Sequence, residues 1–161
     1  MIFDLMIKGG TVIDPETETE KKLNIGIKKD IIKTLTKKDI KGKKIIDASN
    51  LIVAPGFIDI HTHSDITVLV NGKSESKIRQ GVTTEVIGNC GSSPAPAKGE
   101  AFNSLKQELA EYELEAEWKS YPEYLDRLEK ADKSVNIVPL VGHGSLRKSV
   151  MGYENRKPSS I

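Results

Sequence analysis

The sequence of 161 residues lacks several features that mark particular classes of protein. It contains a single cysteine, Cys90, so no disulfide can form within the chain. Its apolar runs are only a few residues long, too short to cross a bilayer. The opening MIFDLMIKGG has no basic flank and carries an acid at Asp4, unlike a secretory signal peptide. Together these absences lead us to expect a protein of the reducing cytoplasm, without a membrane partner.

A strong charge of either sign is also missing. The chain has 24 Lys and Arg against 23 Asp and Glu, a formal net charge of +1. This balance gives no electrostatic reason to expect nucleic acid or an anionic membrane as the partner. A hydrophobic content of 37% with 29% charged residues is typical of a globular protein with a sizeable core.

What is present begins with short strands and turns in residues 1–55. FDLMIKGG alternates and is predicted to stop at Gly9-Gly10, and TVID follows it up to Pro15. LNIGIKKDIIKTL predicts a hairpin with its turn at Lys29-Asp30, and KKIIDASNLIVAPG predicts two more strands. These strands have too few partners to cover both faces of a sheet. We therefore expect residues 1–55 to be the N-terminal part of a β-sandwich domain that serves as a scaffold.

Residues 56–161 change to an alternation of strand and helix. The predicted strands are GFIDI, VTTEVIG and VNIVPLVG; the predicted helices are SKIRQG, residues 100–118, residues 121–131 and SLRKSVMG. Such alternation is typical of parallel βα units. The expected fold class is α/β: the β-sandwich portion, then the first three units of a truncated TIM-type (β/α)8 barrel, which needs eight. We accordingly expect the chain to be part of something longer.

The motif GFIDIHTHSD places two histidines at a predicted strand end. His61 and His63 are two residues apart, so their side chains share one face of an extended chain, with Cα atoms roughly 6.5 Å apart. Two imidazoles in this arrangement can converge on one cation, and Asp59 is placed to orient one of them. The alternative is a pair of solvated or hydrogen-bonded histidines, because so short a motif often occurs without a metal.

The next two strand ends carry the remaining candidates. Cys90 follows the second strand in a loop of Gly, Ser and Pro, a poor place for apolar filler and a good one for a thiolate ligand. His143 follows the third strand, where it either contacts a substrate carbonyl or holds a loop. Because successive strands of a βα barrel are neighbours, His61, His63 and Cys90 predict a zinc site.

These residues also carry a family resemblance. APGFIDIHTHSD, QGVTTEVIGNCGSSPAP and LVGHGSLR, in that order, resemble the amidohydrolase superfamily and, more narrowly, its N-acyl-D-amino-acid deacylases (D-aminoacylases). The His-x-His strand is shared across the superfamily. The GNCG loop is narrower, because most relatives use a carboxylated lysine or a glutamate there. The resemblance covers essentially the whole chain, but only the first part of a family member.

The resemblance implies a zinc-dependent hydrolase that releases a carboxylic acid and a D-amino acid from a small N-acyl amino acid. It implies that Cys90 is shared by two metal positions and that His61 and His63 serve the weaker one. The family's general base is a late aspartate, expected beyond Ile161, so we expect this chain by itself to be inactive. The alternatives are a cyclic amidase of the hydantoinase or dihydroorotase type, and an inactive fragment with a role in assembly.

Overall fold

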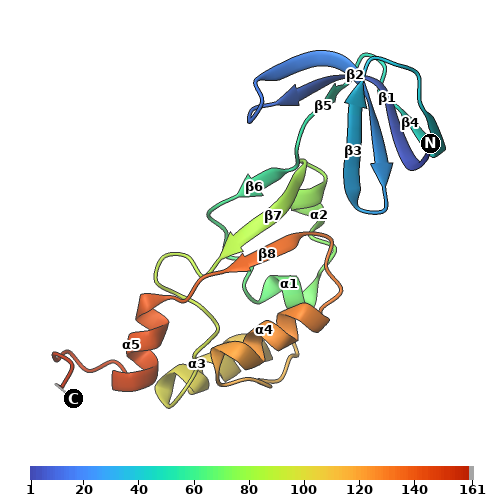
Figure 1. Cartoon of the computed structure of the whole chain (residues 1–161). Helices are drawn as coiled ribbons and strands as arrows, with labels where there is room; N and C mark the ends of the chain where they lie inside the picture. Colours follow the sequence, from blue (N-terminus) through green and yellow to red (C-terminus); the bar gives the residue numbers. More distant parts are fainter. Residues whose placement is uncertain (160–161) are drawn as a thin grey trace. The chain divides into compact units, whose positions relative to one another are not determined.

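A computed structural model describes residues 1–159 and divides the chain into two compact units, Met1–Pro55 and a second that begins at Gly56 (Figure 1). No helix among residues 1–159 has the length and apolar character that a membrane crossing requires.

The first unit is a five-stranded sheet with the order β3-β2-β1-β4, in which β5 also pairs with β1. Its strands are β1 (Ile2–Asp14), β2 (Thr19–Lys28), β3 (Ile31–Thr36), β4 (Lys41–Asp47) and β5 (Ile52–Val53). β1 is antiparallel to β2 and parallel to β4 and β5, and β2 and β3 form the predicted hairpin. Lys29, in its turn, has a φ of 53°.

The prediction that a strand stops at Gly9-Gly10 was wrong. β1 continues through both glycines, and its register with β2 shifts between Ile7 and Gly10. Gly9 has a φ of 72°, the left-handed backbone that glycine adopts without a penalty. A Cβ on Gly10 would lie 2.5 Å from a methyl carbon of Val53, so this glycine lets β5 approach β1. The glycine pair therefore produces a bulge, which bends the strand without ending it.

The first unit buries few apolar side chains for its number of strands. The buried set is Phe3, Met6, Val12, Ile25 and Ala48. The large apolar side chains that stay exposed include Ile31, Ile32, Leu35, Ile45, Ile46, Leu51 and Ile52.

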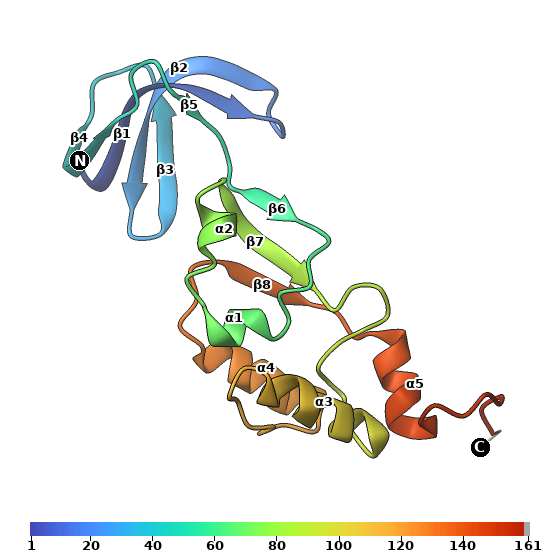
Figure 2. The same ribbon diagram turned by 180° about the vertical axis from the view of Figure 1, so that it is seen from behind.

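The second unit is built on a parallel sheet with the order β6-β7-β8, visible from both sides in Figures 1 and 2. Its strands are β6 (Phe57–Asp59), β7 (Val82–Ile87) and β8 (Asn136–Pro139). Its helices are α1 (Thr67–Val70), α2 (Glu75–Ile78), α3 (Glu100–Ala110), α4 (Tyr121–Lys130) and α5 (His143–Met151). The predicted alternation of strand and helix is present, with α1 as an element that the sequence patterns did not indicate.

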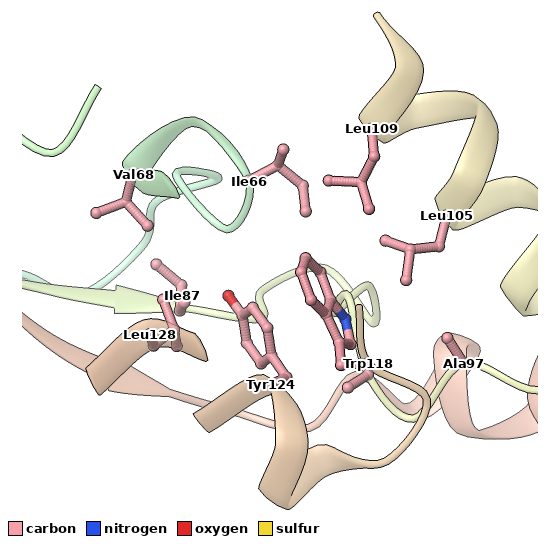
Figure 3. Close-up of a cluster of buried hydrophobic side chains, with 10 residues drawn as sticks. Ile66, Val68, Ile87, Ala97, Leu105, Leu109, Trp118, Tyr124 and Leu128 are labelled. Carbon is pink, nitrogen blue, oxygen red and sulfur yellow. The ribbon is translucent and has the colours of Figure 1, made fainter. Parts of the chain in front are cut away.

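Helices α3 and α4 and the segments around α1 and β7 meet in one apolar core (Figure 3). It contains Ile66, Val68, Ile87, Ala95, Ala97, Leu105, Leu109, Trp118, Tyr124 and Leu128. Two polar groups of these core residues have partners: the Trp118 indole N–H donates to the Pro94 carbonyl at 3.0 Å, and the Tyr124 hydroxyl donates to the Asp65 carbonyl at 2.9 Å. Because each of these two groups makes a hydrogen bond, neither is left unsatisfied when its side chain is buried.

The helix predicted over residues 100–118 ends early, at Ala110. Glu111 and Glu115, and likewise Glu113 and Glu117, would be like-charged neighbours four residues apart on a continued helix, which destabilises it. The chain instead turns, with a φ of 58° at Glu113, and this returns Trp118 to the core. The prediction of a helix over residues 121–131 is confirmed by α4. Ser120 and Glu123 form a capping box that fixes where this helix starts.

Candidate metal centre

The strand order places the three predicted strand-end segments at one edge of the sheet. β6, β7 and β8 are parallel neighbours, so their C-terminal ends lie together. His61 and His63 follow β6, Cys90 follows β7, and His143 follows β8. The parallel pairing of these three strands thus brings residues that are up to 82 positions apart in the chain to the same edge of the sheet.

The structure brings His61, His63 and Cys90 together. One ligand atom from each lies within 4.8 Å of the others, and this is the one such group of three found among residues 1–159. His61 Nε2 lies 3.1 Å from Cys90 Sγ, and the two imidazole rings have centroids 5.5 Å apart. Zinc bonds to nitrogen of about 2.0–2.1 Å and to sulfur of about 2.3 Å put neighbouring tetrahedral ligands about 3.5 Å apart. The 3.1 Å between His61 Nε2 and Cys90 Sγ is close to this spacing, and two imidazoles with one thiol are a set of donors that suits zinc.

His143 is separate from this group. It is the first residue of α5 and its side chain is exposed at the same edge of the sheet. It does not belong to the cluster of ligand atoms found within the described residues. The His143 side chain is therefore open to solvent at the edge of the sheet that carries the candidate centre.

Asp59 holds the histidine segment through the backbone. Its Oδ1 accepts from the backbone N–H of His61 at 3.2 Å, and its Oδ2 accepts from Lys77 Nζ at 2.7 Å. The expectation that Asp59 would orient an imidazole is not what the structure shows. The Lys77 ammonium, followed by the His61 N–H, lowers the pKa of the Asp59 carboxyl, which keeps it charged.

The loop that carries Cys90 has an unusual backbone. Cys90 has a φ of 54°, between Gly88 at 80° and Gly91 at 75°. A residue with a Cβ rarely adopts this left-handed conformation, and such strained residues cluster at functional sites. The strain is held in place by Asn89, whose Nδ2 donates to the carbonyls of Thr62 and Val86. The Asn89 amide thereby joins the cysteine loop to the residue between the two histidines.

Asp65 makes a second link between these loops. Its Oδ1 accepts from the Gly88 N–H at 2.8 Å, and its carbonyl accepts from the Tyr124 hydroxyl. Burial raises the pKa of the Asp65 carboxyl. The sequence analysis identified neither Asp65 nor Asn89, although each lies within two residues of a predicted ligand. Their proximity in the chain was the only signal, because their partners come from other strands.

A cavity of about 150 Å³ opens beside His63. Its lining includes Asp65, Ser104, Glu108 and Lys148. Burial, followed by repulsion from Asp65, raises the pKa of the Glu108 carboxyl. The candidate centre therefore borders a small polar space that contains groups of both charges.

The chain is similar in sequence to known proteins. A family model described as the amidohydrolase family matches residues 44–159. A D-aminoacylase from Alcaligenes xylosoxydans xylosoxydans is 40% identical over 153 residues, which are 92% of this chain and 31% of the relative.

Two solved structures are similar over nearly the whole chain. One is N-acyl-D-glutamate deacylase from Bordetella bronchiseptica, complexed with zinc and a phosphonate inhibitor, with a TM-score of 0.84 and 31% identity over 99% of this chain. The other is a D-aminoacylase described by its binuclear metal center, with a TM-score of 0.82 and 34% identity over 98% of this chain. The chain spans 34% and 33% of these structures, about a third of each.

Proposed function

The chain belongs to the amidohydrolase family, and on that premise we propose that it is part of a zinc-dependent hydrolase of N-acyl-D-amino acids. The reaction breaks the amide C–N bond with water and yields a carboxylic acid and a free D-amino acid. The observation that carries the proposal is the convergence of two imidazoles and one thiol at the ends of β6 and β7. Likeness to a D-aminoacylase and to an N-acyl-D-glutamate deacylase supports this substrate class.

The similarity to these enzymes also supports a proposal for the fold. Residues 56–161 form the first three βα units of a (β/α)8 barrel, and residues 1–55 form part of a β-sandwich. The parallel order β6-β7-β8, with helices between successive strands, supports the barrel. In such a barrel the C-terminal strand ends form the active-site face, which is where the candidate ligands lie.

In this proposal His61, His63 and Cys90 hold the zinc. Each imidazole would bind through a neutral ring nitrogen and Cys90 as thiolate, so metal binding would release protons. The family resemblance implies that Cys90 would also serve a second metal position. The chemistry that bound zinc supplies is Lewis-acid polarisation of the amide carbonyl.

The remaining roles belong to residues around the ligands. His143, exposed at the start of α5, is proposed to donate a hydrogen bond to the substrate. Asn89 and Asp65 hold the two ligand-bearing loops in register through their bonds to Thr62 and Gly88. We assign no general base among residues 1–159.

The test is Cys90→Ala, with Ser92→Ala as the matched control in the same loop. We expect Cys90→Ala to lose bound zinc by atomic emission and, in the full-length enzyme of which this chain is proposed to be a part, to lose hydrolysis of N-acetyl-D-amino acids. Ser92→Ala should keep both, because it leaves all three ligand atoms in place. Unchanged zinc in Cys90→Ala would contradict the ligand assignment. Hydrolysis of hydantoins in place of N-acetyl-D-amino acids would contradict the substrate class.

A further inference from the structure

Glu85 of β7 is an unusual residue for its position. It is fully buried, with 0% of its surface exposed. It lies two residues before Ile87, so the two side chains share a face of the strand, and Ile87 belongs to the apolar core. An apolar side chain would fill such a site at less cost, because a buried carboxylate loses its hydration. The contacts of Glu85 should therefore explain why a carboxylate is there.

The one hydrogen-bond partner of the Glu85 side chain in residues 1–159 is next to a candidate metal ligand. Ser64, which directly follows His63, donates from its hydroxyl to Glu85 Oε2 at 2.5 Å. The other oxygen, Oε1, is buried and has no partner within the described residues. The carboxylate thus uses its single bond to hold the end of the histidine segment.

A second carboxylate holds the other end of that segment. Asp59 is the partner of Glu85 in the parallel pairing of β6 with β7. Asp59 accepts from the backbone N–H of His61, and Glu85 accepts from the side chain of Ser64. Two acids at paired positions therefore hold His61 at one end of the histidine segment and Ser64 at the other.

We propose that Glu85 is a positioning residue for the metal centre, acting through Ser64 on the histidine segment that carries His61 and His63. This inference rests on the proposed zinc site. The partners of metal ligands orient them, and their loss typically weakens metal affinity 10- to 100-fold. Here the bond acts on the residue beside the ligand, so the lower end of that range is expected.

Ser64→Ala tests the proposal, because it removes the donor and leaves Glu85 in place. Metal affinity is measured on the full chain by competition with a chelator, for zinc and separately for cobalt. We expect zinc affinity about 10-fold weaker than wild type, with altered visible absorption of the cobalt-loaded protein. Ser64→Thr keeps the hydroxyl and should restore both, since Ser64 lines a cavity of about 340 Å³ that has room for a methyl group. Ser76→Ala removes a different hydroxyl from the lining of that cavity and should leave both unchanged.

The outcomes separate this inference from the proposed function. A wild-type chain that binds no zinc would refute the metal site itself. A wild-type chain that binds zinc, with Ser64→Ala equal to it in affinity and cobalt spectrum, would overturn the role of Glu85 alone, even if the melting temperature fell. If Ser64→Ala does not fold, Glu85→Gln decides: a folded variant with weaker affinity supports the proposal, and wild-type affinity or failure to fold overturns it.

Discussion

The unit Met1–Pro55 is one sheet with a small set of buried apolar side chains, whereas the unit that begins at Gly56 places helices against its sheet and encloses a core around Trp118 and Tyr124. Every residue to which we assign a chemical role lies in the second unit, at or near the ends of its strands. A buried core on one side of a sheet can hold strand ends firmly enough to position ligands. The first unit has no comparable core and, in the proposal, serves as scaffold.

Carboxyl groups are held charged by partners in both units, and the second unit also contains a buried one. In the first, the backbone N–H of Lys29 and the ammonium of Lys43 lower the pKa of Asp4 to about 2. In the second, burial raises the pKa of Asp65. Partners stabilise the charge of Asp4 in the first unit and of Asp59 in the second. The second unit also withdraws Asp65 from water, where it holds a loop beside the candidate centre.

The contrast in cores is tested most strongly by Leu109→Ala. Leu109 is completely buried in the core of the second unit, so truncation should lower the free energy of unfolding by about 2–5 kcal/mol. Urea denaturation followed by the fluorescence of Trp118, the sole tryptophan, measures this unit directly. Leu125→Ala is the control on α4, because that side chain is 37% exposed and its loss should cost much less. Equal losses for the two variants would show that this core is not what stabilises the unit.

A smaller change in the first unit sharpens the comparison. Ile25 is buried in its sheet, and Ile25→Val should lower the free energy of unfolding by about 0.5–1.5 kcal/mol. Circular dichroism of the strands should report the loss. Because the buried residues of the two units form separate sets, we expect the Trp118 transition to keep its urea midpoint. A matching shift of that midpoint would show that the units unfold as one.

The smallest effect is expected at Asp4. Its folded pKa of about 2 lies below the unfolded value of about 3.9, so its carboxylate stabilises the fold above about pH 4. That contribution is lost as the pH falls through about 2. Asp4→Asn should therefore have a lower urea midpoint than wild type at pH 6, and the difference should shrink steadily towards pH 2. A difference independent of pH would mean that the charge of Asp4 does not contribute.

Local patterns in the sequence predicted most elements but not all of their ends. The hairpin at Lys29-Asp30 and the alternation of strand and helix after Gly56 follow from short-range periodicity, and the structure has both. Gly9-Gly10 was misread because a glycine pair ends a strand or bends it according to what packs beside it, and Val53 is distant in sequence. The early end of α3 depends on the return of Trp118 to the core, which is also a long-range effect.

In the candidate site, too, some features were predicted from the sequence and others depend on long-range contacts. His61, His63 and Cys90 were predicted as one group because parallel neighbouring strands end at the same edge, and their ligand atoms do lie together. Their role as metal ligands stays a prediction. The supporting contacts of Asp65, Asn89 and Glu85 were not predicted, because each joins two strands through hydrogen bonds that no spacing rule reveals. The bond from the His61 backbone N–H to Asp59 is local, spanning two residues, and was missed because the same carboxylate was expected to orient an imidazole.

The exposed sulfur of Cys90 has a practical consequence for anyone handling this polypeptide. A maleimide or iodoacetamide reagent finds a single cysteine to react with, and the attached group would lie beside the two imidazole rings. Dye labelling and cross-linking at that atom would thus alter the very region under study. A label attached through a group other than a thiol leaves Cys90 unmodified and is the sounder choice.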